Sequence, residues 1–354
     1  MPFAKKLAIK FDAIDYPDNR RINKEPTPRM GGVAIFGGMA ITFLILIITS
    51  RHLNWFGMHL GFLEYETDYR VVAFGIFFMF LVGAIDDIVG LKASQKLFGQ
   101  ILASCIVCTG GLTLGFIQNP FSDGQLINFG IFSWPITIFY LVAFANIINL
   151  IDGLDGLASG ISAITASTLG IYGALTSRVD VLILSAILIG ACIGFLKFNH
   201  HPASIFMGDS GSLTLGFCLG ILSLLAIART ALVFSLLVPI LAAGVPITDT
   251  LVAIIRRKKA HKPVGEADKS HIHHRLIQAG FSQNKTVAIM CGWSAVLSIC
   301  GLVFAELSGI AKPLSLIVAA SITGFAIYKL QLLEPVLQHY YNPRKRRKSI
   351  KNKK

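Results

Sequence analysis

The feature that most constrains this chain is the length of its uncharged runs. Residues 131–151, IFSWPITIFYLVAFANIINLI, contain no acidic side chain, no basic side chain and no histidine. A helix of about 20 mostly apolar residues reaches across the hydrocarbon core of a bilayer. Only 14% of the 354 residues are charged, whereas a typical soluble domain contains about 25%. The chain is therefore predicted to be a membrane protein.

Similar apolar runs recur along most of the sequence. They predict an all-α polytopic membrane protein with about ten transmembrane helices. Several runs are rich in Gly, Ser and Thr, as in GGVAIFGGMAIT, and small residues allow membrane helices to pack closely. The expected spans lie near residues 31–50, 70–86, 97–116, 131–151, 157–176, 181–197, 211–228, 231–254, 286–307 and 312–331.

The basic residues predict the orientation of these spans. With the spans placed as above, 27 of the 32 Lys and Arg residues fall on one side, and such an excess marks the cytoplasmic side. Both termini are therefore expected in the cytoplasm. This bias, together with anionic membrane lipid as a partner, explains the net charge of +13. Nucleic acid is not an expected partner.

Five aspartates gather at the predicted cytoplasmic ends of separate spans. GAIDD contains Asp86 and Asp87, NLIDGLDG contains Asp152 and Asp155, and FMGDSGS contains Asp209. An ordinary helix cap would explain Asp209 alone, but not the pairs or the one-sided distribution. Clustered carboxylates repel one another unless a cation joins them, and oxygen ligands suit Mg²⁺ or Mn²⁺. The acids therefore predict a divalent metal and, since Mg²⁺ often keeps positions for phosphate, a phosphorylated substrate.

A basic cytoplasmic loop, residues 256–280, gives a second signal. Its HIHHR segment holds His271, His273, His274 and Arg275. A zinc site is one interpretation, but the loop has no HExxH pattern and no nearby cysteine. Imidazole and guanidinium groups in a basic loop suit phosphate oxygens and sugar hydroxyls better. A solvated basic loop remains the plain alternative, mainly for the RRKK stretch.

Two further segments lie on the same predicted side. NKEPTPRMGG, residues 23–32, leads into the first span, and its prolines and glycines predict a shaped turn whose amides could approach a ligand. KASQKLFGQ, residues 92–100, places Lys96 a short loop after the first aspartate pair. Lys96 can pair with those acids or with a phosphate; the alternative is a lysine that extends from a helix end toward water.

Taken in order, six segments resemble the polyprenyl-phosphate N-acetylhexosamine-1-phosphate transferases, glycosyltransferase family 4. They are PTPRMGG, GAIDD, ASQKLFGQ, NLIDGLDGLASG, FNHHPASIFMGDSGS and HIHHRLIQAGF, within a resemblance from about residue 10 to 330. Each segment alone is modest evidence, whereas the ordered set is specific. The resemblance implies a multi-pass protein of the bacterial inner (plasma) membrane, with its active-site cleft on the cytoplasmic face.

The resemblance also implies residue roles. Asp209 would hold Mg²⁺, with Mn²⁺ as an alternative ion, while Asp155 and Asn199 would contact the uridine and Phe206 would stack on its base. The expected catalytic residues are Asp86, Asp87, Lys96, Asp152, His271, His273 and His274. The expected substrate-binding residues are Lys24, Asn149, Asp155, Asn199, Phe206 and Arg275.

The HxHH form followed by RLIQAGF resembles the branch of the family that uses N-acetylglucosamine. The expected reaction is transfer of N-acetylglucosamine 1-phosphate from UDP-GlcNAc to undecaprenyl phosphate, with release of UMP. Its product would start a cell-envelope glycopolymer such as teichoic acid or another polysaccharide. The alternative within the family is the phospho-N-acetylmuramoyl-pentapeptide transferase of peptidoglycan synthesis.

Two other classes of protein fit the sequence less well. Transporters usually place ionisable groups near the bilayer midplane, and of the aspartates on the predicted cytoplasmic side only Asp249 falls well inside a predicted span. A structural scaffold would not need five aspartates at one face. Both classes are therefore kept as rivals that an activity assay separates.

The expected organisation is one integral membrane transferase domain, residues 1–335, followed by a basic cytoplasmic tail, residues 336–354. Members of the family usually carry a span before the segment matching AIDYPDNRR, for which this sequence has no room. The expectation is either a truncated start or a member without that helix, and a homodimer is left open. The expected catalytic loops are residues 1–30, 86–96, 150–157, 197–211 and 255–285.

Overall fold

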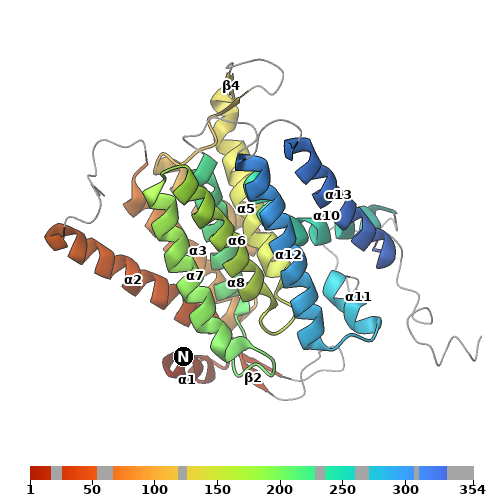
Figure 1. The fold of residues 1–354 in the computed structure, drawn as a ribbon. Helices are drawn as coiled ribbons and strands as arrows, with labels where there is room; N and C mark the ends of the chain where they lie inside the picture. Colours follow the sequence, from red (N-terminus) through yellow and green to blue (C-terminus); the bar gives the residue numbers. More distant parts are fainter. Residues whose placement is uncertain are drawn as a thin grey trace, which may run out of the picture.

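The computed structural model describes residues 1–16, 26–53, 67–118, 126–227, 236–259, 271–306 and 311–332. They form a mostly helical protein, as predicted, with two short antiparallel strand pairs (Figure 1). The helices are α1 (Pro2–Lys10), α2 (Gly31–Leu53), α3 (Tyr69–Val89), α4 (Ala93–Thr109), α5 (Ser133–Ile151), α6 (Leu157–Leu175), α7 (Val179–Asn199), α8 (Gly208–Ile227), α9 (Leu237–Ala242), α10 (Gly244–Lys259), α11 (Ile272–Gln278), α12 (Gln283–Glu306) and α13 (Ala311–Lys329).

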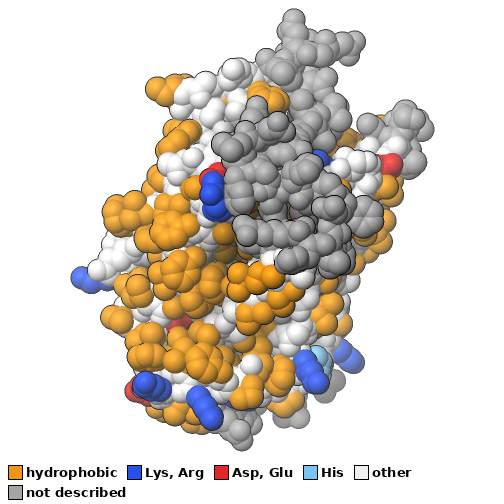
Figure 2. Space-filling model, turned by 90° about the vertical axis from the view of Figure 1, so that its left-hand side faces the viewer, with side chains coloured by type: hydrophobic (Ala, Val, Ile, Leu, Met, Phe, Trp, Pro, Cys, Tyr) orange, Lys and Arg blue, Asp and Glu red, His pale blue; other side chains and the backbone are white. Residues whose placement is uncertain are grey.

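Several helices have the length and composition of membrane spans. Among the described residues, six helices meet both conditions: α3, α5 with the preceding 3-10 turn Gly130–Phe132, α6, α7, α8 and α12. Each of the ten predicted spans contains helix, while ten crossings stay a prediction. Figure 2 shows hydrophobic side chains over much of one face, with several Lys and Arg side chains along its lower edge. The chain is thus a multi-pass membrane protein by the apolar character of its helices.

Helix α8 lies at the centre of the bundle. The whole of its apolar window is buried, and it packs against α2, α3, α5, α6 and α7. A helix that is apolar all round is expected to be surrounded in this way. Glycines allow the close approach: a Cβ on Gly216 would lie 2.5 Å from the carbonyl oxygen of Phe144 in α5. The packing fixes the N-terminus of α8, which carries Asp209.

The N-terminal segment is attached to the loop that leads into α8. Strand β1 (Ile14–Asp15) pairs with β2 (Thr27–Pro28). Backbone hydrogen bonds then join Phe206 N–H to the Pro28 carbonyl (2.8 Å) and Gly31 N–H to the Phe206 carbonyl (2.8 Å). The other pair, β3 (Phe116–Gln118) with β4 (Leu126–Asn128), lies at the opposite end of the bundle (Figure 1). The pairing of β1 with β2 and of Pro28 with Phe206 therefore places Arg29, which follows β2, beside Asp209.

The helix in the predicted span over 231–254 is interrupted at Ala243, which divides it into α9 and α10. Pro246 has no N–H and cannot complete the helical hydrogen bond to the Ala242 carbonyl. That carbonyl instead accepts from the hydroxyls of Thr165 (3.0 Å) and Ser294 (3.3 Å). Neighbouring helices thus satisfy the freed backbone group, as membrane helices require.

The contact between α3 and α8 gives a stability prediction. A Cβ on Gly83 would lie 2.5 Å from the Asp209 carbonyl oxygen and 2.6 Å from Ser210 Cα. Gly83→Ala should therefore separate the two helices and lower the free energy of unfolding by about 1–3 kcal/mol, as overpacking does. Thermal unfolding in detergent, followed by tryptophan fluorescence, measures it.

Gly38→Ala is the matched control, because a Cβ on Gly38 in α2 would meet nothing within 4 Å. This variant should keep the unfolding midpoint of the parent protein. Equal midpoints for the two variants would contradict the close α3–α8 contact.

Candidate active site

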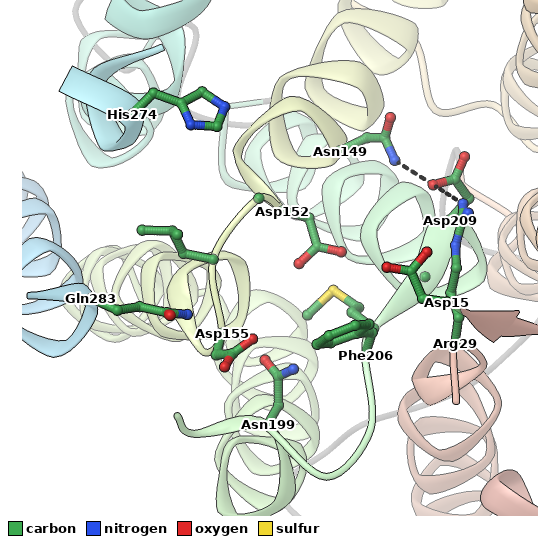
Figure 3. A pocket seen from close by; sticks show the side chains of 14 residues that line it. Asp15, Arg29, Asn149, Asp152, Asp155, Asn199, Phe206, Asp209, His274 and Gln283 are labelled. Carbon is green, nitrogen blue, oxygen red and sulfur yellow. Dashed lines mark hydrogen bonds and ion pairs between the residues drawn. The ribbon is translucent and has the colours of Figure 1, made fainter. Parts of the chain in front are cut away.

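A polar pocket opens where the ends of several elements meet. Its volume is about 310 Å³, within the usual range for ligand sites. Figure 3 shows Asp152 near the middle, Arg29 and Asp209 on one side, and His274 and Gln283 on the opposite side. Seven of the predicted site residues line it, namely Asn149, Asp152, Asp155, Asn199, Phe206, Asp209 and His274.

Asp209 joins three segments of the chain. It is the second residue of α8. Its Oδ1 accepts hydrogen bonds from Asn149 Nδ2 (3.0 Å), in the last turn of α5, and from Arg29 Nη2 (3.3 Å), just after β2. Its Oδ2 accepts from the ammonium of Lys96, in the first turn of α4. The carboxylate at the pocket wall is therefore held by donors from separate elements.

The neighbouring Asp87 binds the backbone rather than the pocket. Its Oδ1 accepts from the Asp209 N–H (2.7 Å) and its Oδ2 from the Ser210 N–H (2.9 Å). The Nε of Arg29 lies 3.2 Å from the same Oδ1. The first N–H groups of a helix have no partner inside the helix. Asp87, which belongs to α3, supplies that partner for α8 and so fixes Asp209.

Asp86, next to Asp87 in α3, contacts the turn between α3 and α4 and the first turn of α4. Its Oδ1 accepts from the Leu91 N–H (2.7 Å), and its Oδ2 lies 3.0 Å from the Lys96 ammonium. Asp86 thus orders the turn between α3 and α4 and holds Lys96 against Asp209. Asp86, Asp87 and Lys96 adjoin the pocket wall without lining the cavity, and their direct catalytic roles stay predictions.

The predicted uridine side is built from two loops. Asp155 Oδ2 contacts His201 Nδ1 (2.7 Å) and accepts from the Ala203 N–H (3.2 Å). The side-chain amide of Asn199 accepts from the Gly156 N–H (2.9 Å) and donates to the Ile205 carbonyl (3.0 Å). Asn199 therefore shapes the site through the backbone. Phe206, half-buried, presents a flat apolar ring to the cavity (Figure 3).

The HIHHR segment is not presented to the pocket as a whole. His274 lines the cavity, whereas His271 and His273 are buried. Burial, with a smaller contribution from His274, lowers the pKa of His273 to about 3, so this imidazole is neutral at pH 7. Arg275 Nη1 donates to the carbonyls of Leu330 and Gln331 and does not line the pocket. Lys24 lies outside the described residues.

Among the pocket residues with polar side chains, three were not predicted: Asp15, Arg29 and Gln283. Arg29 stands in PTPRMGG, separated by Met30 from Gly31 and Gly32, and a Cβ on Gly32 would overlap the start of α8. The glycine pair is the sequence signal that could have placed Arg29 beside Asp209, because glycines allow this segment to approach the start of α8 closely. The start of β1 gave no comparable signal for Asp15, and Gln283 belongs to an unremarkable turn before a span.

The charges of the pocket favour a bound cation. Its described lining includes four carboxylates, and Arg29 is the only Lys or Arg among these residues. In the part of the chain that is described, no three His, Cys, Asp or Glu side chains form a metal cage. Mg²⁺ commonly takes one or two carboxylates and completes its shell with water and phosphate. Asp209, at the pocket wall, fits that kind of site.

Comparison with known proteins gives a family match and similar relatives. The family described as Glycosyl transferase family 4 matches residues 69–227. The chain is 36% identical over 302 residues to the probable undecaprenyl-phosphate N-acetylglucosaminyl 1-phosphate transferase of Bacillus subtilis (85% of this chain, 80% of that protein). It is 36% identical over 319 residues to the decaprenyl-phosphate N-acetylglucosaminephosphotransferase of Mycolicibacterium smegmatis (84% and 76%). It is 34% identical over 323 residues to a phospho-N-acetylmuramoyl-pentapeptide-transferase of Clostridium botulinum (86% and 90%).

The position of Asp152 gives a pH prediction. Burial, followed by repulsion from Asp209, raises the pKa of Asp152 from 3.8 to about 8. Between about pH 4 and about pH 8 the folded protein therefore binds a proton that the unfolded chain has lost, and this contribution to stability falls as the pH rises. Asp152→Asn removes the effect, so its stability relative to the parent should increase from about pH 5 to about pH 8. Thermal unfolding in metal-free detergent measures the difference.

Asp68→Asn is the control for this titration. Hydrogen bonds from Arg70 lower the pKa of the half-buried Asp68, so the contribution of Asp68 to stability is constant above about pH 5. A difference between Asp152→Asn and the parent that does not change with pH would sink the assignment of a protonated Asp152.

Proposed function

This chain belongs to glycosyl transferase family 4, and we propose that it transfers N-acetylglucosamine 1-phosphate from UDP-GlcNAc to undecaprenyl phosphate. UMP is released and undecaprenyl-diphosphate-GlcNAc is formed. The observation that carries the proposal is the convergence of Asn149, Lys96 and Arg29 on Asp209 beside the pocket. It gives an anionic centre with adjacent cations, which suits the transfer of a phosphoryl group.

The chemistry depends mainly on position and charge. The lipid phosphate attacks the phosphorus that carries the sugar, and the bond from that phosphorus to the UMP oxygen breaks. The second pKa of a phosphate monoester is about 6, so the nucleophile is mostly a dianion at pH 7 and needs little help from a base. The residues therefore have to hold both phosphates together and offset their repulsion.

Mg²⁺ is the proposed cofactor, held by Asp209, with Mn²⁺ as an alternative. When bound, it would neutralise charge on the diphosphate and on the leaving UMP. Asn149 would fix the orientation of the Asp209 carboxylate through its hydrogen bond of 3.0 Å. Lys96 and Arg29 would add positive charge at the same wall. Asp87 would keep the start of α8 in place.

The pocket also suggests how the donor is oriented. Asp155 and the ring of Phe206 lie on one wall, and His274 and Gln283 lie on another (Figure 3). We assign the first wall to the uridine and the second to the sugar. Asp152 lies between them, next to the phosphates. Such an arrangement uses aromatic stacking and polar side chains for the two neutral parts of the donor.

The proposed orientation is ten spans with both termini in the cytoplasm and the pocket facing the same side. The proposal is supported by the excess of Lys and Arg in the predicted cytoplasmic loops. It is also supported by α1, which contributes Lys5, Lys6 and Lys10 at the end of the bundle that holds β1 and β2 (Figure 1). UDP-GlcNAc, a cytoplasmic metabolite, would then enter directly.

A transfer assay tests the proposed reaction. Membranes that contain the protein are incubated with radiolabelled UDP-GlcNAc and undecaprenyl phosphate, and labelled lipid is extracted. We expect labelled diphosphate lipid with Mg²⁺ and a loss of at least about 100-fold after chelation, because the metal neutralises the transferred charge. UDP-MurNAc-pentapeptide is run in parallel. Product from that donor alone would replace this proposal by the pentapeptide transferase, and no product from either would favour a transporter.

The metal assignment predicts the effect of Asp209→Ala. This variant should lower turnover by at least about 100-fold, because the proposed metal ligand is lost. Asp68→Ala is the matched control. Asp68 caps the N-terminal end of α3, opposite to the end that carries Asp86 and Asp87, and it does not line the pocket. Near-normal turnover of purified Asp209→Ala would refute Asp209 as the ligand.

A further inference from the structure

The histidine that lines the pocket, His274, belongs to a short helix. Helix α11 has only seven residues, Ile272–Gln278, and isolated helices of this length are not stable in water. His274 is in its first turn and lines the cavity. The position of His274 therefore depends on what holds α11 against the bundle.

The beginning of α11 is bound by Asp249 of α10. Asp249 Oδ1 accepts a hydrogen bond from the Ile272 N–H (2.9 Å), and Oδ2 lies 3.0 Å from His271 Nδ1. Asp249 and His271 are both buried, with 3% and 6% of their surfaces exposed. A buried carboxylate with two hydrogen bonds is a strong attachment, since loss of either partner leaves a buried polar group unpaired. Asp249 thus caps a helix that lies 23 residues later in the chain.

The end of α11 is bound by its own arginine. Arg275, with 1% of its surface exposed, donates to the carbonyls of Leu330 (3.2 Å) and Gln331, at the end of α13. Arg256 of α10 donates to the next carbonyl, that of Leu332 (2.7 Å). The terminal carbonyls of a helix have no partner within the helix, and cations near them are favourable. Helices α10, α11 and α13 therefore form one connected unit.

The histidine rings connect Asp249 to the pocket. The rings of His271 and His273 are parallel within 4°, with centroids 5.9 Å apart, and the centroids of His273 and His274 are 4.2 Å apart. His273 also packs on Gly153 of the pocket wall, where an added Cβ would lie 2.6 Å from its Nε2. A displacement of His271 would therefore pass to His273 and His274 through contacting rings.

We propose that Asp249 is a positioning residue: by binding the Ile272 N–H and His271, it sets His274 at the sugar-phosphate side of the pocket. This inference rests on the proposed function, because it assigns His274 to the donor substrate. In the HIHH segment, His274 would face the substrate, and His271 and His273 would hold His274 in position. Asp249 itself does not line the pocket.

A double-mutant cycle tests the proposal. If Asp249 acts through His274, Asp249→Ala should lower kcat about tenfold or more in the parent protein, since small misplacements of catalytic groups are costly. In a His274→Ala protein the same substitution should lower kcat by less than about twofold, because residues in one network are not additive. Independent, multiplicative losses in the two backgrounds would overturn the proposal.

Two further variants separate positioning from general stability. Asp249→Asn keeps an oxygen for the Ile272 N–H and should recover much of kcat, with KM for UDP-GlcNAc near the parent value. Tyr140→Phe removes a part-buried hydrogen bond of 2.8 Å to Ser223, which joins α5 to α8 and involves no residue of α10 or α11. This control should lose the same fraction of kcat in the parent and in His274→Ala. An Asp249→Asn protein no better than Asp249→Ala would count against the positioning role.

Hydrogen exchange gives a readout that does not depend on turnover. In Asp249→Ala, or in Asp249→Leu should the alanine variant not fold, no side-chain oxygen remains for the Ile272 N–H. Exchange should then increase in the peptide spanning 271–278 and not in α8, while Tyr140→Phe should leave 271–278 unchanged. Increased exchange of 271–278 in a protein with no activity on UDP-GlcNAc would support the attachment while the proposed reaction fails. Unchanged exchange of 271–278 in an active protein would overturn the attachment while the reaction stands.

Discussion

The arrangement of the site depends on one interaction, the binding of the start of α8 by the carboxylate of Asp87. Both oxygens of this side chain accept from successive backbone N–H groups, those of Asp209 and Ser210. A helix N-terminus inside a protein requires such partners, and here they come from a different helix. The same contact fixes Asp209, so that Asn149, Lys96 and Arg29 meet at one carboxylate. The helix bundle and the pocket wall are therefore built by the same hydrogen bonds.

The negative charge of the pocket is the second constraint. Four carboxylates line it beside the single Arg29 in its described lining, and carboxylates at short range cannot all ionise without compensation. In the protein alone, Lys96 and Arg29 offset Asp209, and burial raises the pKa of Asp152 to about 8. A divalent cation and a diphosphate together would bring one positive and one negative component to the same place. The pocket is thus suited to bind the cation and the diphosphate together better than either of them alone.

The sequence predicted the helical membrane fold and the gathering of Asp86, Asp87, Asp152, Asp155 and Asp209, because long apolar runs leave most charged residues at or beyond the span ends. It did not separate residues that face the cavity from those that hold them. His271 and His274 are equivalent as letters, yet one binds Asp249 and the other lines the pocket. Arg275 was predicted to bind substrate, and in the structure its guanidinium donates to the carbonyls of Leu330 and Gln331. Such differences depend on contacts between residues that are far apart in the sequence, and a local sequence pattern does not predict them.

The complete enclosure of α8 has a consequence for how the protein responds to its membrane. Lipid thickness acts on the helices that it touches, which tilt or shift when their apolar length does not match the bilayer. Helix α8 is covered along its whole apolar length by other helices, so it has no lipid contact through which thickness could act. Asp209 stands at the start of this shielded helix. A bilayer that becomes thinner or thicker would therefore deform the outer helices first and reach the phosphate-handling end only through their packing against the centre.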